Sequence, residues 1–372
     1  MKVNSRPKQD EWRIIETLLP DGWQNKAWEL GAFRRSRYGN DPGDVLRLLL
    51  FHAVNDGGLR STVTEAKAAG IASMSAVGLF KRLRTSVPWL RWIALELCRP
   101  LRERPKAPAN LRPRAIDSTT IQEPGSTTSN WRLHYSLDLL TLGCDWHELT
   151  NGRGAEGLQR TPVEPGDVLI GDRNYLRLKG IRPVVSGGGH VLIRMKWGHP
   201  RLENPEGDRI KALDLVGDLQ AGQIGEWPVC VPSKDGKPIP ARIIALKLSR
   251  PLAEAAIKRL KKRASKRQQA LNPKSIQAAH FIFLFTTIPG TILDASGVAD
   301  LYRFRWQVEI AFKRHKQLLA LGQLPHKDPL AAEAWILLKL IVALLLETLL
   351  RQAESISPWG FSFDQLKGAD AS

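Results

Sequence analysis

The pattern of apolar and polar residues divides the chain into a helical first part and a strand-rich remainder. Before about residue 105, apolar residues recur with helical spacing, as they do over residues 44–55, where the pattern stops at Gly57. We therefore expect a small all-α N-terminal domain over residues 1–105. The Pro- and Arg-rich stretch over residues 101–114 is typical of a linker. An α/β domain is expected to follow it over residues 106–372.

Two of the expected N-terminal helices meet at a glycine turn. Ser61 and Thr62 are candidate N-caps of the first helix, which ends at Gly70. The second helix begins near Ser73 to Ser75 and carries basic residues at positions expected to be exposed. This is a helix-turn-helix pattern, which predicts contact with DNA. A corner of the same kind also occurs in all-α domains that bind no nucleic acid.

After the linker the pattern changes to short strands. Residues 114–117 and the continuous apolar run over 168–172 are typical of strands, and they end in Asp117 and Asp172. Three further strands are expected over residues 131–139, 145–149 and 189–195, and a helix near residues 175–180. Ligands of open α/β sheets collect at the carboxyl ends of strands. We therefore place both aspartates at one candidate site.

Residues 197–288 depart from this rhythm and predict a β-rich insertion. Two alternating stretches indicate a small antiparallel sheet, and a strand near residues 281–288 returns to the main sheet. Between them lies a helix with a dense run of cations: Lys258, Arg259, Lys261, Lys262, Arg263, Lys266 and Arg267. So dense a run favours an arm that follows DNA phosphates. A flexible basic segment without a fixed partner is the alternative.

The most informative stretch lies at residues 301–319, which sort into three faces on one α-helix at about 100° per residue. One face is apolar and another is polar. The third gathers Tyr302, Arg305, Trp306, Glu309, Lys313 and Lys316. A lone carboxylate among cations and aromatic rings indicates an acid, a base or a metal ligand beside an anion such as phosphate. A solvated face with an ion pair between Glu309 and Lys313 is the alternative.

Composition favours the interpretation that an anion binds here. The 372 residues include 55 Lys and Arg against 37 Asp and Glu, so the net charge is +18. Such an excess favours nucleic acid or an anionic membrane as partner. The longest apolar run, residues 335–350, contains Lys339 and Glu347, and it predicts a buried core helix rather than a membrane span. We therefore expect double-stranded DNA as the partner and no membrane.

Two further patterns bear on location and energy source. The N-terminal residues contain no apolar signal core, and the three cysteines are too sparse for a disulfide framework. Both observations favour a reducing, cytoplasmic compartment. The chain also lacks the glycine-rich phosphate loop of ATP-driven enzymes.

With these motifs in place, the chain resembles the DDE transposases of the insertion-sequence family four type. Tyr302, Arg305, Glu309 and Lys316 match the spacing of that family's Tyr-Arg-Glu-Lys signature. Residues 116–120, Ile-Asp-Ser-Thr-Thr, resemble its first-aspartate motif, and residues 171–175, Gly-Asp-Arg-Asn-Tyr, resemble its second. The resemblance extends over about residues 114–350.

The resemblance implies an RNase H-like catalytic core with a β-rich insertion, in which the two aspartates lie on adjacent strands and the glutamate lies on a helix beside them. It implies that Asp117, Asp172 and Glu309 are catalytic and hold two Mg²⁺ ions, for which Mn²⁺ can substitute. The implied reactions are hydrolysis at the element end, which frees a 3′-hydroxyl, and attack of that hydroxyl on target DNA. The implied assembly is a homodimer in a DNA-bound synaptic complex.

The expected DNA contacts come from two regions. On the helix of the signature and beside Asp172 they are Tyr302, Arg305, Trp306, Lys313, Lys316 and Arg173; in the insertion they are Lys258, Arg259, Lys261, Lys262 and Arg263. Trp306 would stack on a flipped base or pack at the edge of the core, and Arg173 would contact phosphate or form a local ion pair. Two other functions stay open: an RNase H-like nuclease without strand transfer, and a catalytically inactive DNA-binding descendant of a transposase.

Overall fold

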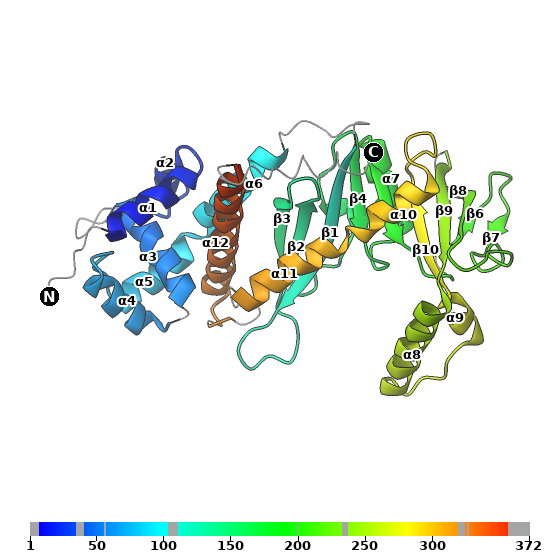
Figure 1. Cartoon of the computed structure of the whole chain (residues 1–372). Coiled ribbons are helices and arrows are strands. Elements are labelled where there is room, and N and C mark those ends of the chain that lie inside the picture. The colour runs from blue at the N-terminus through cyan, green and yellow to red at the C-terminus, as the bar shows by residue number, and fades with distance from the viewer. Residues whose placement is uncertain are drawn as a thin grey trace.

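The computed structural model describes residues 7–34, 41–55, 57–102, 111–198, 200–232, 237–318, 324–325 and 327–355. Within these ranges the chain is mixed α/β, with one sheet of ten strands and helices at both ends of it (Figure 1). The strand order is β3-β2-β1-β4-β5-β10-β9-β8-β6-β7.

The described residues before the first strand form helices only. They are α1 (Pro7–Leu18), α2 (Trp23–Glu29), α3 (Pro42–Asn55), α4 (Leu59–Ala68), α5 (Ala76–Thr85) and α6 (Val87–Arg102). The corner between α4 and α5 turns at Gly70, whose φ of 68° suits glycine, and the Ser75 hydroxyl accepts a hydrogen bond from the Gly78 amide at 3.1 Å. The predicted glycine turn and the predicted start of the second helix are therefore confirmed.

The predicted caps of α4 are wrong. The helix begins at Leu59, so Ser61 and Thr62 both lie inside its first turn. Thr62 is buried, and its hydroxyl lies 2.8 Å from Nδ1 of His52 on α3. The polar side chain therefore ties α4 to α3 instead of capping it. Residues 103–110 of the predicted linker lie outside the described residues.

The last helix joins the N-terminal helices to the sheet. This helix, α12 (Pro329–Ser355), contacts α3, α5, α6 and also strand β3, and Figure 1 shows it standing between the two groups. One core cluster contains Leu49 of α3, Trp89 of α6, Leu137 of β2 and Ile341 of α12. The predicted extents of two domains stay a prediction, but one core cluster contains apolar side chains from both of them.

Most of the apolar run at residues 335–350 is buried, as predicted, and only its last turns contain exposed leucines. By length and composition, Pro329–Gln352 is the one helix in the described ranges that could cross a membrane, but 72% of its most apolar window is buried inside the protein. Lys339 is 2% exposed, and its ammonium group lies 4.8 Å from the centre of the Trp335 ring. The helix therefore serves as a core element in this fold.

The first half of the sheet contains the strands that the candidate site needs. They are β1 (Arg112–Ile121), β2 (Trp131–Asp138), β3 (Gly143–Asn151), β4 (Asp167–Gly171) and β5 (His190–Arg194). Strands β1, β2 and β3 pair in antiparallel order, whereas β1, β4 and β5 run parallel. The short helix η2 (Leu158–Arg160) precedes β4, and α7 (Leu178–Ser186) connects β4 to β5.

Two boundaries differ from the predictions in this half. Strand β1 does not end at Asp117 but continues to Ile121, because it pairs with β2 along this whole length. Helix α7 begins at Leu178, three residues later than expected, because a turn after Asp172 takes up the intervening residues.

The insertion consists of β6 (Leu202–Glu203), β7 (Arg209–Ile210), β8 (Ile224–Val231), β9 (Ile239–Lys247), α8 (Arg250–Lys266), α9 (Pro273–Ala278) and the returning strand β10 (Phe281–Thr286). Its strands pair in antiparallel order, as the two alternating stretches predict, but they do not form a small sheet of their own. Strand β10 pairs with β5 on one side and with β9 on the other, so the strands of the insertion extend the main sheet.

Residues 301–319 do not form the single helix that their periodicity predicts. Helix α10 (Ala295–Arg303) ends before Phe304 and Arg305, and α11 (Trp306–Leu318) begins after them. Backbone bonds of the i to i+3 type cross the break, including Arg305 to Tyr302 at 3.1 Å. The break lets α10 bury Val298 in one core cluster while α11 buries Phe312 in another.

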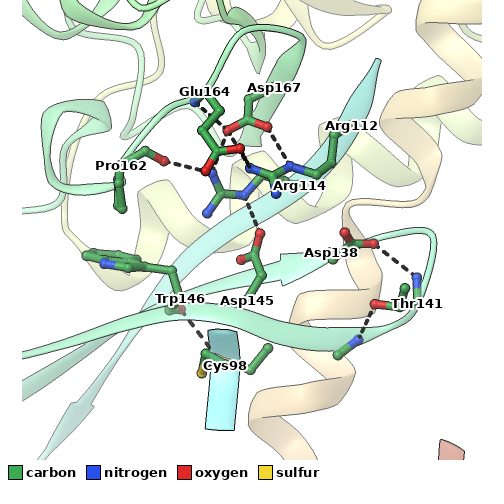
Figure 2. Close-up of polar contacts among 12 residues, drawn as sticks. Cys98, Arg112, Arg114, Asp138, Thr141, Asp145, Trp146, Pro162, Glu164 and Asp167 are labelled. Carbon is green, nitrogen blue, oxygen red and sulfur yellow. Dashed lines mark hydrogen bonds and ion pairs between the residues drawn. The ribbon is translucent and has the colours of Figure 1, made fainter. Parts of the chain in front are cut away.

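A buried network of ion pairs lies at the start of β1 (Figure 2). Arg112 binds Asp167 of β4 through Nε at 2.6 Å and Nη2 at 2.9 Å. Arg114 binds Asp167 at 2.8 Å and Asp145 of β3 at 2.5 Å, and its Nη1 also donates to the Pro162 carbonyl. Burial opposes the ionisation of Asp167, but the bond from Arg112 and the charge of Arg114 outweigh it and lower the pKa. The network ties β1 to its neighbour β4 and, across β2, to β3.

We predict that Arg114→Met destabilises the protein by about 3–5 kcal/mol, because it removes the cation that pairs with the buried Asp145 carboxylate. Arg250→Met is the matched control: Arg250 pairs with Glu254 on α8, its side chain is 91% exposed, and its loss should cost less than about 1 kcal/mol. Urea unfolding followed by circular dichroism measures both. Equal losses would contradict a structural role for the buried network.

Candidate active site

The register of two parallel strands brings the two predicted aspartates together. Ala115 of β1 pairs with Ile170 of β4, so Asp117 and Asp172 each lie two residues beyond this pair. Adjacent strands are about 4.8 Å apart, and residues two apart share a face of the sheet. Both aspartates are half-buried. Burial raises the pKa of Asp117 to about 6, and the charge of Asp172 adds to this effect, whereas the Ser118 amide and Arg305 oppose it.

Asp172 is oriented by the turn that follows β4. Its Oδ1 accepts a hydrogen bond from the Asn174 amide at 2.7 Å, and its carbonyl accepts one from the Tyr175 amide at 3.1 Å. Gly171 makes room for this turn, because a Cβ there would lie 3.1 Å from the Tyr175 side chain. Tyr175 is buried, which raises its pKa, and the charges of Asp117 and Asp172 raise it further. The glycine and the tyrosine of this motif therefore support the aspartate between them.

The helix that carries Glu309 packs on the same face of the sheet as Asp117. Asp117 pairs directly with Tyr135 of β2, so both side chains lie on one face. The Tyr135 ring lies 5.5 Å from the Phe312 ring and 5.4 Å from the His315 ring, both on α11 (ring centres). Figure 1 shows α11 crossing the sheet at β2 and β1.

Glu309 itself is exposed and binds Arg305. Nη2 of Arg305 lies 2.5 Å from Oε1 of Glu309, and its guanidinium carbon lies 5.9 Å from the centre of the Tyr302 ring. Burial opposes the charge of Arg305, but Glu309, Tyr302 and then Asp117 outweigh it and raise the pKa. The alternative of an ion pair between Glu309 and Lys313 is not what the structure has, because Glu309 pairs with Arg305, whose charge also interacts with Asp117.

The three carboxylates are not gathered as one metal cage. Within the described ranges, no group of three or more His, Cys, Asp or Glu side chains lies close enough together to hold a metal ion. Asp117 and Asp172 do fit a hard dication, because they offer carboxylate oxygens from adjacent strands and their mutual repulsion contributes to the raised pKa of Asp117. Glu309, the third candidate donor, binds Arg305 through its Oε1.

Sequence reasoning missed Glu156, which lies in the loop after β3. Its Oε1 accepts hydrogen bonds from the Ser118 hydroxyl at 2.7 Å and from Nη1 of Arg132 at 2.9 Å. The Ser118 amide in turn donates to Asp117 at 2.8 Å. Glu156 therefore supports the residue next to the first aspartate, and its charge also raises the pKa of Asp117. No periodicity or motif marks this loop residue in the sequence.

Sequence reasoning also missed Arg194, although a signal was present. Ile193 of β5 pairs with Gly171, so Arg194 lies level with Asp172 at the same edge of the sheet. Burial lowers the pKa of Arg194, and the cations Arg173, Arg305 and Arg259 lower it further. A charged residue at the end of a short apolar run is the pattern that identified both aspartates. Applied to the run before Arg194, the pattern finds this residue as well.

The structure places the other predicted residues at the surface. Trp306 is 51% exposed, so packing in the core does not explain it. Lys313 and Lys316 are exposed on α11, and Arg173 is exposed beside Asp172 and makes no ion pair among the described residues. The five cations named on α8 are exposed as well, on a different part of the surface from α11.

Comparisons with known proteins identify the family. The profile described as "Transposase DDE domain" matches residues 145–345. The transposase InsL for insertion sequence element IS186A of Escherichia coli strain K12 is 32% identical over 94% of this chain and 96% of its own length. The transposase for insertion sequence element IS421 of Escherichia coli is also 32% identical, over 94% and 96%. The chain belongs to the DDE transposases of the insertion-sequence family four type.

This DDE transposase is therefore an enzyme of DNA transposition. Its family cleaves and joins DNA strands with divalent metal ions, and a mechanism with two metal ions is general in it. A piggyBac transposase in a synaptic complex with hairpin DNA is also similar in structure, with a TM-score of 0.46 and 11% identity over 92% of this chain and 73% of that chain.

We predict that Asp117→Asn stabilises the metal-free transposase by about 1–2 kcal/mol at pH 7. The pKa of Asp117 rises from 3.8 to about 6 on folding, so the folded state loses stability as the pH rises from about 4 to above 6. The asparagine variant has no proton to lose, so its advantage should be absent at pH 4. Thermal melting of both proteins from pH 4 to pH 7.5 with EDTA measures this difference. A difference in melting temperature that stays the same at every pH would contradict the raised pKa of Asp117.

Proposed function

We propose that Asp117, Asp172 and Glu309 form the catalytic set of this transposase and that Mg²⁺ is its natural ion, with Mn²⁺ as a substitute. The observation that carries this proposal is the register of β1 and β4, which sets the two aspartates side by side on the face that α11 crosses. Aspartates on adjacent strands with a glutamate on a helix beside them also support an RNase H-like core. Mg²⁺ prefers such carboxylate oxygens.

The proposed site needs one local rearrangement. Asp117 and Asp172 would hold the ions from the sheet, and Glu309 would join them after turning away from Arg305. Two ions about 4 Å apart would stabilise the attacking and leaving oxygens of a phosphodiester. Arg305, released from Glu309, would then bind a phosphate beside the cut with Tyr302, Lys313 and Lys316, as a guanidinium does well.

We also propose the partners and the place of action. The substrates are the double-stranded ends of the insertion element and the target DNA, held in a synaptic complex by a homodimer in the cytoplasm. The corner between α4 and α5 is a second DNA contact, for which Lys81 is exposed. Two other cations of α5 already have partners in the protein, since Arg82 donates to the Ala32 carbonyl at 2.6 Å and Arg84 pairs with Asp328 at 3.4 Å.

We expect Asp172→Ala and Glu309→Ala each to abolish cleavage while they leave binding of the element end within about threefold, because they remove metal ligands rather than phosphate contacts. A labelled duplex carrying the DNA that flanks the gene is incubated with Mg²⁺, with EDTA, and with target DNA. Asp300→Ala, which removes an exposed carboxylate paired with Arg303 on α10, is the matched control and should cleave normally.

The products of the same assay separate the candidate functions. Joining of the labelled strand to target DNA supports transposition. Metal-dependent nicks without joined products would indicate a nuclease, and binding without cleavage in Mg²⁺ or Mn²⁺ would indicate an inactive descendant. Normal cleavage by either alanine variant would remove that residue from the catalytic set.

Trp306→Ala should reduce processing of the element end about tenfold or more, because a base stacked on an aromatic ring contributes about 1–3 kcal/mol. Its stability should change by less than about 0.5 kcal/mol, since the side chain is 51% exposed. Trp306→Phe keeps an aromatic face and should restore most of the rate. Thermal melting and single-turnover cleavage of the three proteins test this, and a large loss of melting temperature with no loss of rate would indicate a packing role.

A further inference from the structure

A cation-lined cavity lies between the sheet and the helix of the insertion. It has a volume of about 420 Å³, with walls from the end of β5, from β10 and from α8. Figure 1 shows α8 and α9 projecting beyond β9 and β10 at one end of the sheet, away from the N-terminal helices. Five cations line it: Arg173, Arg194, Lys196, Arg259 and Arg263. The remaining lining is mostly apolar and includes Trp197 and Phe281. We call this cavity the α8 cleft.

Helix α8 separates its run of cations into two groups. Ala256 and Leu260 line the α8 cleft, and Arg259 and Arg263, four residues apart, line it beside them. Lys258 and Lys262 have the same spacing but do not line the cleft, because a step of about 100° per residue turns them to another side of the helix. The sequence predicts one basic arm, whereas the structure distinguishes a pair of arginines in the cleft from a pair of lysines outside it.

The positive charge of the α8 cleft is not neutralised by the described part of the protein. No Asp or Glu lines the cleft, and none of its five cations takes part in an ion pair within the described ranges. The guanidinium of Arg194 is close enough to Arg173 and Arg259 for their charges to oppose its own. Like charges held together in this way cost free energy unless an anion binds among them.

The α8 cleft is continuous with the candidate active site. Arg173 follows Asp172 in the chain, and Arg194 lies level with Asp172 in the sheet. Arg194 also interacts with Tyr302 and Arg305, which lie beside Glu309. A polyanion bound at the aspartates can therefore extend along Arg173 and Arg194 to Arg259 and Arg263.

We propose that the α8 cleft binds the phosphodiester backbone of one DNA strand, at nucleotides that continue from the reacting phosphate toward α8. A cavity of this size accepts a ligand of one or two nucleotides rather than a whole duplex. Arginines are suited to phosphate because their planar fork donates two hydrogen bonds to it. This inference rests on the proposed function, since it assigns a binding site to the strand that the transposase cleaves.

The test compares two double variants with the same loss of charge and the same spacing on one helix. Arg259→Gln/Arg263→Gln alters the α8 cleft, and Lys258→Gln/Lys262→Gln alters the other side of α8. The probe is a fluorescein-labelled duplex carrying the DNA that flanks the gene, and anisotropy gives Kd over a range of salt concentrations with EDTA. Circular dichroism melting confirms that both variants fold like the wild type. Arg194→Gln tests the cleft from the side of the sheet.

We expect the arginine pair to weaken binding about tenfold or more and to reduce the slope of log K against log salt by about two, because each arginine replaced leaves one phosphate without its cation. The lysine pair should change Kd by less than about threefold. Arg194→Gln should weaken binding in the same direction as the arginine pair. Equal losses from both pairs would indicate diffuse attraction and overturn the proposal, as would no loss from the arginine pair.

The proposed function can fail separately from this inference. Wild-type protein that binds the duplex through the arginine pair but cleaves nothing in Mg²⁺ or Mn²⁺ would overturn the proposed function and leave the α8 cleft as a DNA site. Normal wild-type cleavage together with equal binding by both double variants would overturn the α8 cleft alone.

Discussion

The buried ion pairs at the start of β1 are the constraint on which the rest of the structure depends. Arg112 and Arg114 bind Asp167 at the start of β4, and Arg114 also binds Asp145 of β3, so three strands are held in one register. That register decides what lies at the other end of the strands. A slip of one residue would turn Asp117 to the opposite face of the sheet, away from α11. The buried ion pairs take no part in the proposed reaction, but they fix the position of Asp117 relative to Asp172 and α11.

The second requirement is the core cluster that joins the N-terminal helices to the first strands of the sheet and to the two C-terminal helices. Helix α12 packs between the N-terminal helices and β3, and α11 packs beside it on β1 and β2. The Tyr135 hydroxyl donates to Glu347 of α12 at 3.1 Å, while the Tyr135 ring contacts Phe312 and His315 of α11. The residue opposite Asp117 is therefore held by both C-terminal helices, and the packing of the N-terminal helices bears on the position of the site.

The site combines two arrangements of charge that are unfavourable without ligands. Asp117 and Asp172 repel each other at the edge of the sheet, and the cations of the α8 cleft repel one another nearby. Arg305 connects the two groups of charges, because it interacts with Asp117 on one side and with Arg194 of the α8 cleft on the other. A protein that handles dications and a polyanion needs both arrangements, and the large buried core supplies the stability that offsets them.

The sequence by itself determined the local elements and the chemical types of the site. Apolar runs ending in Asp117 and Asp172 predicted two strands with a carboxylate at one edge of the sheet, and the run at residues 335–350 predicted a buried helix. These features depend on periodicity and neighbours in the chain, which a single sequence contains. Its resemblance to DDE transposases agreed with the family that the comparisons established.

Only the tertiary structure decided how distant segments meet. Helices α10 and α11 are separated at Phe304 and Arg305, because their apolar faces pack into different core clusters. Strand β10 joins the insertion to the main sheet. The tertiary fold also brought Glu156 beside Ser118 and placed Arg259 and Arg263, rather than Lys258 and Lys262, in the α8 cleft. Such contacts depend on packing between residues far apart in the chain, and no local pattern of side chains specifies them.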